Sequence, residues 1–428
     1  MERYNEYKDS GVQWLGEIPS HWELKHLRNF LTIFSEKGHG DKQLLSVTRE
    51  KGVILRDKDN KEENHNFVPD DLSGYKHLCA GDFVINKMKS WQGSYGVSEY
   101  EGIVSPAYFT CKLRGVDPKF FSRAIRSKAY IGFFMQYSKG IRVDQWDLDP
   151  NSMKDIPFVL PTLPEQQAIA TYLDTATAKI DEAIAQQQKM IDLLNERKQI
   201  IINNAVTKGL NPDAPMKDSG VDWIGEICKN WRMYRLKHLL KTNLMYGANE
   251  SAESEETSYP RYIRITDIDE NGKLKPDTFR SLEPIKAEPY LLTRGDILFA
   301  RSGATAGKTY LFDEDIKACF AGYLIKAQVS NKLLPRYLMY YTRSGIYDQW
   351  KNSIFIQATI QNIGADKYAN LRIPLPTIEE QKTIVSYLDT ETMKIDKVLD
   401  THKRQISLLQ ERKQIIINDV VTGKVKVL

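Results

Sequence analysis

The sequence predicts an α+β fold in which two mixed α/β domains are separated by two long helices, and the helices pair as an antiparallel coiled coil. Three observations support this prediction. The chain of 428 residues is too long for one ordinary core, so two or more domains are expected. Two segments of the sequence each occur twice along the chain, which indicates a pseudo-two-fold internal repeat. Each repeat contains a long stretch of apolar residues at helical spacing.

The composition describes a folded globular protein, with 41% hydrophobic and 27% charged residues. No apolar run is long enough to span a bilayer, and residues 1–10 are too charged for a signal peptide. The cysteines are far apart, so a disulfide framework and a cysteine metal cluster are not expected, and a cytoplasmic location with no membrane partner fits best. These cysteines are Cys79, Cys111, Cys228 and Cys319.

The repeat is clearest in two pairs of matching segments. Residues 8–22 read KDSGVQWLGEIPSHW, and residues 217–231 read KDSGVDWIGEICKNW. Residues 160–207 recur at 375–422, where both copies contain the string ERKQIII. Between these segments the two halves differ, although both keep a Gly-Asp pair before an apolar strand. This pattern is typical of a duplicated scaffold in which each copy binds something different.

The repeated segments at 165–204 and 379–419 are expected to form helices about 60 Å long. Prolines near the start of the first, Pro161 and Pro164, and Gly209 after its end agree with its boundaries. A solitary helix of this length would leave its apolar stripe exposed to water, so we expect an antiparallel coiled coil, although two separate core helices are an alternative. The expected seam consists of Leu173, Ile180, Ile184, Ile191, Leu194, Leu388, Ile395, Leu399, Ile406 and Leu409.

The domain boundaries follow from these segments. We expect a first α/β domain at 1–157, a helix at 158–208, a second α/β domain at 209–372 and a second helix at 373–428. Within the domains, the β-rich runs at 44–48, 82–88, 262–268 and 296–301 predict strands, and residues 118–135 and 335–350 predict helices.

The net charge of +4 is weak evidence for a nucleic-acid partner, but its distribution is more informative. Residues 165–204 carry −2 and residues 379–419 carry −1, so the rest of the chain carries +7. The positive excess therefore belongs to the two α/β domains, where a surface that binds DNA would need it.

The repeated motifs resemble the specificity subunits of type I restriction-modification systems. The SGVxWxGEIPxxW opening, the proline-rich start of each long helix and the LxERKQxII run all match that family, and the match covers essentially the whole chain. Two local departures concern element geometry: Cys228 stands at the position of Pro19, and Glu379 at that of Pro164.

The resemblance implies a non-catalytic subunit that reads double-stranded DNA. Two target-recognition domains would each read one half of a bipartite, gapped site, and the paired helices would set the gap. Two methylation subunits would dock on the helices, and restriction subunits would join them. The chain itself would bind no cofactor, since S-adenosylmethionine, ATP and Mg would belong to the partner subunits.

The residues expected to contact DNA lie mainly in loops that follow the Gly-Asp strand of each domain. Lys and Arg bind phosphate or guanine, Gln pairs with adenine, and aromatic rings stack or wedge. An ordinary solvated turn is the alternative for each loop. The first loop contributes Lys87, Lys89, Trp91, Gln92, Ser94 and Tyr95, and the second contributes Arg301, Ser302, Thr305 and Lys308.

Two further groups are weaker candidates. Segments just before the long helices are rich in side chains that suit base edges, although capping or packing at the junction explains them equally well. Residues at strand ends suit either DNA contact or an ordinary surface role. The segments contribute Arg142, Gln145, Gln357, Thr359, Gln361 and Asn362, and the strand ends contribute Thr48, Arg49, Arg264 and Thr266.

The segments that resemble enzymatic motifs are all incomplete, so no catalytic or metal-binding residue is expected. Residues 303–309 resemble a phosphate loop but have three residues between the glycines where the motif needs four. Residues 105–108 resemble a methyltransferase element but lack its second proline, and the seven histidines form no metal pattern in the sequence. Two rival functions remain: a self-contained methyltransferase or nuclease, and a protein scaffold whose coiled coil is its whole purpose.

Overall fold

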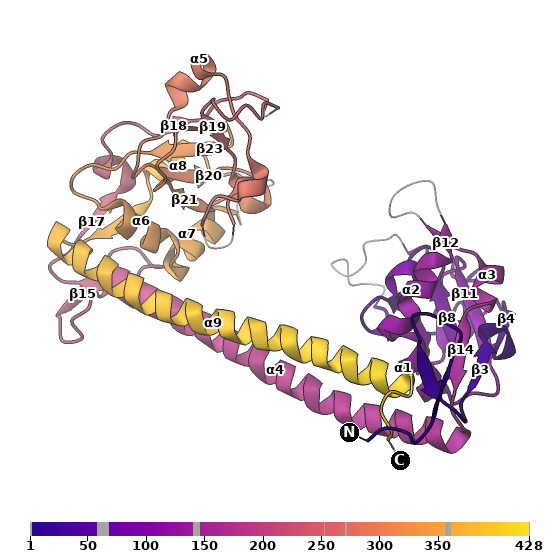
Figure 1. Cartoon of the computed structure of the whole chain (residues 1–428). Helices are drawn as coiled ribbons and strands as arrows, with labels where there is room; N and C mark the ends of the chain where they lie inside the picture. The colour runs from indigo at the N-terminus through magenta and orange to yellow at the C-terminus, as the bar shows by residue number, and fades with distance from the viewer. Residues whose placement is uncertain are drawn as a thin grey trace. The chain divides into compact units, whose positions relative to one another are not determined.

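The computed structural model describes residues 2–57, 68–139, 146–251, 253–269, 272–355 and 361–427. It divides into two compact units (Figure 1). The first unit comprises Met1–Gln188 with Lys403–Leu428, and the second comprises Lys189–His402. Each unit therefore contains one α/β domain together with part of each long helix, α4 (Leu163–Thr207) and α9 (Ile378–Val421).

The first unit is built around a four-stranded antiparallel sheet in the order β4-β11-β8-β9. Its strands are β4 (Leu31–Phe34), β11 (Tyr108–Leu113), β8 (Phe83–Asn86) and β9 (Tyr95–Val97). The same unit contains three short helices, α1 (Pro118–Ile125), α2 (Lys128–Gln136) and α3 (Pro150–Lys154). The remaining strands pair two by two: β1 (Tyr7–Asp9) with β2 (Glu17–Pro19), β3 (Glu23–His26) with β14 (Pro157–Leu160), β5 (Leu45–Thr48) with β6 (Gly52–Leu55), β7 (Lys76–Leu78) with β10 (Gly102–Val104), and β12 (Ser138–Lys139) with β13 (Asp147–Leu148).

The second unit repeats this topology with the strand order β18-β23-β20-β21. These strands are β18 (Met245–Tyr246), β23 (Leu324–Ala327), β20 (Ile297–Ala300) and β21 (Thr309–Leu311). The matching order shows that both halves of the sequence have one fold, as the repeat predicts. The other elements are β15 (Met216–Asp218), β16 (Glu226–Cys228), β17 (Arg232–Arg235), β19 (Arg261–Ile263), β22 (Ala318–Phe320), β24 (Arg372–Leu375), α5 (Pro284–Ala287), α6 (Pro335–Thr342), α7 (Gly345–Phe355) and α8 (Ala365–Ala369).

The repeated motifs form the junction between each domain and its helices. In the first unit the fully buried Trp22 donates its indole N–H to Glu165, which also accepts from Thr162 at the start of α4. In the second unit Trp231 donates in the same way to Glu380. Burial raises the pKa of Glu165, but hydrogen bonds from His21, Thr162 and Trp22 outweigh it and leave the pKa below its ordinary value.

The two long helices run antiparallel within both units. In the first unit Lys413 of α9 binds Asp181 of α4 at 2.6 Å, and in the second Lys198 of α4 binds Asp396 of α9 at 2.5 Å. Within the first unit, the start of α4 (Ile169, Leu173) shares a core with the end of α9 (Ile417, Val420), so residue numbers rise along α4 as they fall along α9. The second unit shows the same order, since the end of α4 (Ile202) shares a core with the start of α9 (Ile384, Leu388). The two ion pairs are also repeats of each other, since Asp181 and Lys198 match Asp396 and Lys413 at the displacement of 215.

The predicted seam divides into two environments. Near the helix ends, Leu173 and Leu388 are fully buried and belong to the domain cores. Further along, the predicted seam residues are buried or half-buried. These are Ile180, Ile191, Ile395 and Leu399, each less than a tenth exposed, and the half-buried Ile184, Leu194, Ile406 and Leu409.

Several sequence-predicted elements are shorter than expected. The helix predicted at 118–135 is two helices, because Arg126 ends α1 and Ser127, with extended backbone, begins α2. The helix at 335–350 divides in the same way at Arg343. The strand predicted at 262–268 ends at Ile263, because Asp267 accepts from the backbone N–H of Arg264 and closes a short 3-10 helix.

The two departures from the family pattern leave this frame intact. Strand β16, which contains Cys228, pairs with β15 as β2 pairs with β1, and α9 begins at Ile378, the equivalent of Leu163 in α4. Within the described ranges, no helix combines the length and the apolar character that crossing a membrane requires.

Candidate nucleic-acid interface

In the first unit, the two groups of candidate residues lie together although they are far apart in the sequence. The loop after β8 contacts the segment before α3 through Trp91 and Trp146, whose ring centroids are 5.0 Å apart. Lys87 forms an ion pair with Asp147 at 3.1 Å, and its carbonyl accepts from the backbone of Leu148. Residues 86–95 and 146–147, together with the β5–β6 turn at 48–50, are called the first candidate face below.

The guanidinium of Arg126, at the end of α1, ties the turn to the loop. It donates to the carbonyls of Arg49 and Glu50 at 3.0 and 2.7 Å, and to that of Tyr95 at 2.5 Å. Arg126 is half-buried, and this burial lowers the pKa of its guanidinium. Arg126 is thus a positioning residue that the sequence analysis missed. The only signal for it was its place after the triplet Pro118-Lys119-Phe120, a proline, a basic residue and an aromatic residue that recur as Pro335-Arg336-Tyr337 in the second domain.

Most of the first-domain candidates are accessible. Lys89 and Arg49 are exposed, and neither side chain forms a hydrogen bond or ion pair with another residue in the described ranges. Trp91, Gln92, Lys87 and Thr48 are half-buried. A cation on a surface loop keeps its freedom to reach a phosphate, so Lys89 and Arg49 are the strongest candidates for backbone contact.

Two first-domain predictions are wrong. Tyr95 is fully buried, and its hydroxyl donates to the carbonyl of Ile125, while its ring stacks on Phe134 at 4.0 Å. It is a core residue of β9, so it is not available to stack on a base. Ser94 is 3% exposed and is likewise excluded from contact.

The second unit brings its candidate segments together in a different way. Ser302 forms an antiparallel bridge with Asn362, and the backbone N–H of Gly303 donates to the carbonyl of Gln361 at 3.1 Å. The residues after the Gly-Asp strand therefore lie beside those before α8. Residues 301–308 and 361–362, with Tyr246 and Tyr323, are called the second candidate face.

Arg301 lies at the centre of the second candidate face. Its guanidinium stands over the ring of Tyr246 at 5.0 Å, and its backbone N–H donates to the carbonyl of Tyr323. Tyr323 is 68% exposed, and Tyr246 is 42% exposed. Exposed aromatic rings beside an arginine suit stacking on bases or sugars. Sequence reasoning missed both tyrosines, because neither lies in a loop matched between the halves.

The other second-domain candidates vary in accessibility. Gly303 has a φ of 73° and open space where a Cβ would stand, but its backbone N–H already donates to the carbonyl of Gln361. Thr305 is half-buried and Thr266 exposed. Lys308 is partly engaged, since its ammonium donates to the carbonyl of Ile268 at 3.0 Å.

Arg264, predicted to contact DNA, is half-buried and is held by contacts within the protein. Its guanidinium forms two hydrogen bonds with the buried carboxylate of Asp267, at 2.7 and 3.0 Å, and a third with the carbonyl of Thr278. Arg264 therefore holds the 3-10 turn that ends β19. Four weaker candidates, Arg142, Gln145, Gln357 and Thr359, lie outside the described residues, so their predicted role stays a prediction.

The histidines need a correction of a different kind. The sequence showed no metal pattern, yet the fold brings His39 and His77 to the same carboxylate, Glu36. The spacing of 38 residues between the two histidines concealed this, and only the Glu36-x-x-His39 pair was visible as a local signal.

Several known proteins are similar to this chain. Residues 228–413 match the family model for the type I restriction modification DNA specificity domain. A protein of Methanocaldococcus jannaschii assigned as the specificity subunit of type I restriction enzyme MjaX is 22% identical, over 96% of both chains. The type I restriction enzyme EcoKI specificity subunit of Escherichia coli strain K12 is 20% identical, over 90% of this chain and 86% of its own length.

A solved structure shares the fold. One chain from a type I restriction-modification system, solved to describe the assembly and conformational transition of that complex, superposes with a TM-score of 0.68 at 16% identity. The match covers 95% of this chain and 99% of the other. This chain therefore resembles type I restriction-modification specificity subunits along almost its whole length, and residues 228–413 match the model of the DNA specificity domain.

Proposed function

We propose that the chain reads a bipartite, gapped DNA sequence as the specificity subunit of a type I restriction-modification complex. Each candidate face reads one half of the site, and the paired helices set the gap and dock two methylation subunits. The chain itself is non-catalytic. S-adenosylmethionine belongs to the methylation subunits, and ATP with Mg belongs to the restriction subunits that join them.

One observation carries this proposal: the two units have the same frame but different candidate faces. The first face offers Lys89, Arg49 and the Trp91–Trp146 pair, whereas the second offers Arg301 with Tyr246. Two readers with one frame and different chemistry would recognise two different short sequences. If the chain were only a protein scaffold, the different side chains in the loops of its two halves would have no explanation. A self-contained methyltransferase would need the cofactor motifs that the sequence lacks.

Mapping of N6-methyladenine in host DNA, with and without the gene, tests the proposal. An asymmetric gapped motif should lose its methylation on deletion, and complementation should restore it. If the purified chain transfers methyl groups without partner subunits, the enzyme rival is correct. If no motif changes in a strain whose methylation subunits work, the chain does not select DNA sequence, and the scaffold rival gains.

Removing the exposed cations of the first candidate face should weaken DNA binding without changing its sequence preference. Lys89→Ala and Arg49→Ala each delete one phosphate contact, so each should lower the slope of log K against log salt by about 1. The measurement is fluorescence anisotropy of the complex with methylation subunits at several salt concentrations.

Lys8→Ala is the matched control, because Lys8 is an exposed lysine on β1 in the same unit. It should leave the slope unchanged. If Lys8→Ala lowers this slope as much as Lys89→Ala does, net charge and not the candidate face determines DNA binding.

A further inference from the structure

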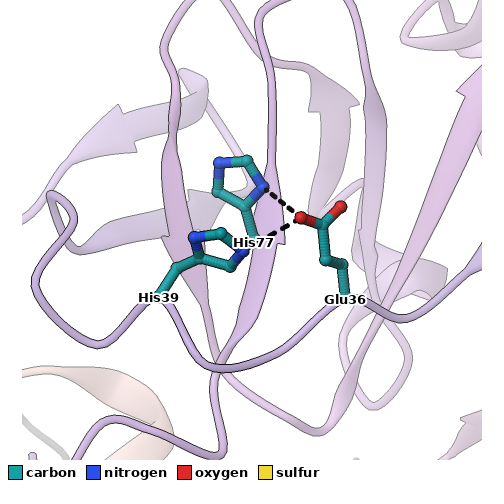
Figure 2. Close-up of side chains that lie close together, drawn as sticks. All are labelled: Glu36, His39 and His77. Carbon is teal, nitrogen blue, oxygen red and sulfur yellow. Dashed lines mark hydrogen bonds and ion pairs between the residues drawn. The ribbon is translucent and has the colours of Figure 1, made fainter.

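The first unit contains a group of metal-ligating side chains away from the repeated motifs. Glu36 and His39 lie in the segment that follows β4, and His77 lies in β7 (Figure 2). One ligand atom from each residue lies within 4.8 Å of the other two. The side chain of His77 is 9% exposed, while those of His39 and Glu36 are 35% and 53% exposed, so the group is open to solvent on one side only.

The distances within the group suit a first-row transition metal. Glu36 Oε1 is 2.9 Å from His39 Nε2 and 3.5 Å from His77 Nδ1. In a tetrahedral zinc site, bonds of about 2.0–2.1 Å place neighbouring ligand atoms about 3.3 Å apart. The two measured distances fall on either side of this value. The imidazole rings of His39 and His77 are stacked, with centroids 4.3 Å apart and planes at 27°, so the half-buried His39 side chain must rotate out of this stack before both rings can share one ion.

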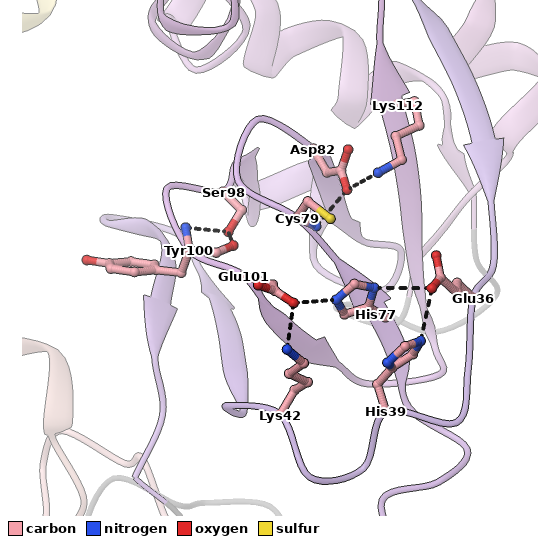
Figure 3. Close-up of polar contacts among 10 residues, drawn as sticks. All are labelled: Glu36, His39, Lys42, His77, Cys79, Asp82, Ser98, Tyr100, Glu101 and Lys112. Atoms are coloured by element: carbon pink, nitrogen blue, oxygen red, sulfur yellow. Dashed lines mark hydrogen bonds and ion pairs between the residues drawn. The ribbon is translucent and has the colours of Figure 1, made fainter.

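The surroundings of His77 strengthen this interpretation. Its second ring nitrogen, Nε2, lies 3.2 Å from Glu101 Oε1, and Lys42 binds the same carboxylate oxygen at 2.9 Å (Figure 3). A carboxylate on the far nitrogen of a metal-bound histidine fixes the ring and its tautomer, and such partners are usual at zinc sites.

We propose that Glu36, His39 and His77 bind one zinc ion in the first unit, with Glu101 orienting His77 and the fourth position left to water. Two imidazoles and one carboxylate favour Zn²⁺ over Mg²⁺ or Ca²⁺, which prefer oxygen ligands. The ion joins the segment after β4 to β7. It thereby supports the sheet from which the first candidate face emerges, since Lys76, beside His77, donates to the carbonyl of Tyr108, and Tyr108 pairs with Asn86.

The site has no counterpart in the second repeat. Between its framework motifs, at residues 232–370, the only histidine in the sequence is His238. The zinc site therefore belongs to the divergent part of the first domain, and only that domain should depend on the metal.

The test measures zinc bound to the untagged full-length chain after dialysis, by elemental analysis and by titration calorimetry. The wild-type chain should hold one zinc that His39→Ala and His77→Asn lack, and Glu101→Gln should bind it about 10–100-fold more weakly. His39→Ala is the principal variant, because the half-buried side chain of His39 is more accessible than that of His77, and circular dichroism confirms its fold. His238→Asn, in the second unit, is the matched control and should bind as the wild type does.

Thermal unfolding provides a second measurement. Zinc should raise the melting temperature of the wild-type chain and of His238→Asn, but not that of folded His39→Ala, and Mg²⁺ should have no such effect. Equal zinc content or an equal shift in wild type and His39→Ala would overturn the proposal. In that case the three side chains would form only the hydrogen-bond network drawn in Figure 3.

Discussion

Trp231→Ala should destabilise the second unit by about 3–5 kcal/mol, the cost typical of truncating a large buried aromatic side chain. The indole is 2% exposed, and its ring lies against Gly209, at the end of α4, where a Cβ would come within 3.2 Å of it. The substitution thus opens a cavity between the domain and the end of a helix that belongs to the other repeat. It also removes the N–H that donates to Glu380.

Chemical denaturation monitored by circular dichroism and intrinsic fluorescence measures this effect. Trp22→Ala should act similarly on the first unit, where the ring lies against Gly423 beyond the end of α9. Trp14→Ala is the matched control: its side chain is 40% exposed and should cost far less. If Trp14→Ala and Trp231→Ala lower the free energy of unfolding equally, the contact between the domain and the helix is not what makes Trp231 important for stability.

Arg126→Met should disable the first candidate face while leaving the second intact. The substitution leaves the carbonyls of Arg49, Glu50 and Tyr95 without their shared donor, which should cost about 3 kcal/mol and separate the turn from the loop. Because DNA readout depends on the relative placement of these segments, we expect at least a tenfold loss of affinity for DNA that carries the correct first half-site.

Binding of the complex to DNA with one or the other half-site scrambled separates the two faces. Discrimination at the first half-site should fall, and discrimination at the second should persist. Arg123→Met on the same helix is the control, since its ion pair with Asp174 is about 40% exposed at both ends and contributes at most about 1 kcal/mol. If both half-sites lose discrimination equally, Arg126 supports the whole protein and not one face.

The fold that the two units share was predictable because the sequence patterns that indicate it are regular. The repeat, the helical stripes and the Gly-Asp strands each rest on a periodic or duplicated pattern, and the structure places α4, α9, β8 and β20 close to their predicted ranges. The helices extend one to three residues beyond the predicted 165–204 and 379–419 at each end. At their starts, Thr162 and Thr377, which precede the predicted boundaries, form side-chain contacts with glutamates.

The candidate faces were only partly predictable. Sequence reasoning identified the loops but not which side chains point outward, so Tyr95 was assigned to DNA although β9 turns it into the core. The internal partner of Arg264, Asp267, is recognisable only once the 3-10 turn is known, and the prediction that Arg264 contacts DNA stays a prediction. Arg126 and Tyr323 were missed because their importance comes from contacts with residues far away in the sequence.

The glutamine at the start of each long helix has a consequence for how such proteins change over generations. Gln166 accepts from the backbone N–H of Asp117, and Gln381 from that of Leu334. Every residue except proline offers this N–H, so the contact places no other demand on the identity of the residue it holds. A segment bounded by the repeated motifs could therefore be replaced by recombination from a relative and still dock correctly. New target sequences would then arise by exchange of whole segments, without a redesign of the frame.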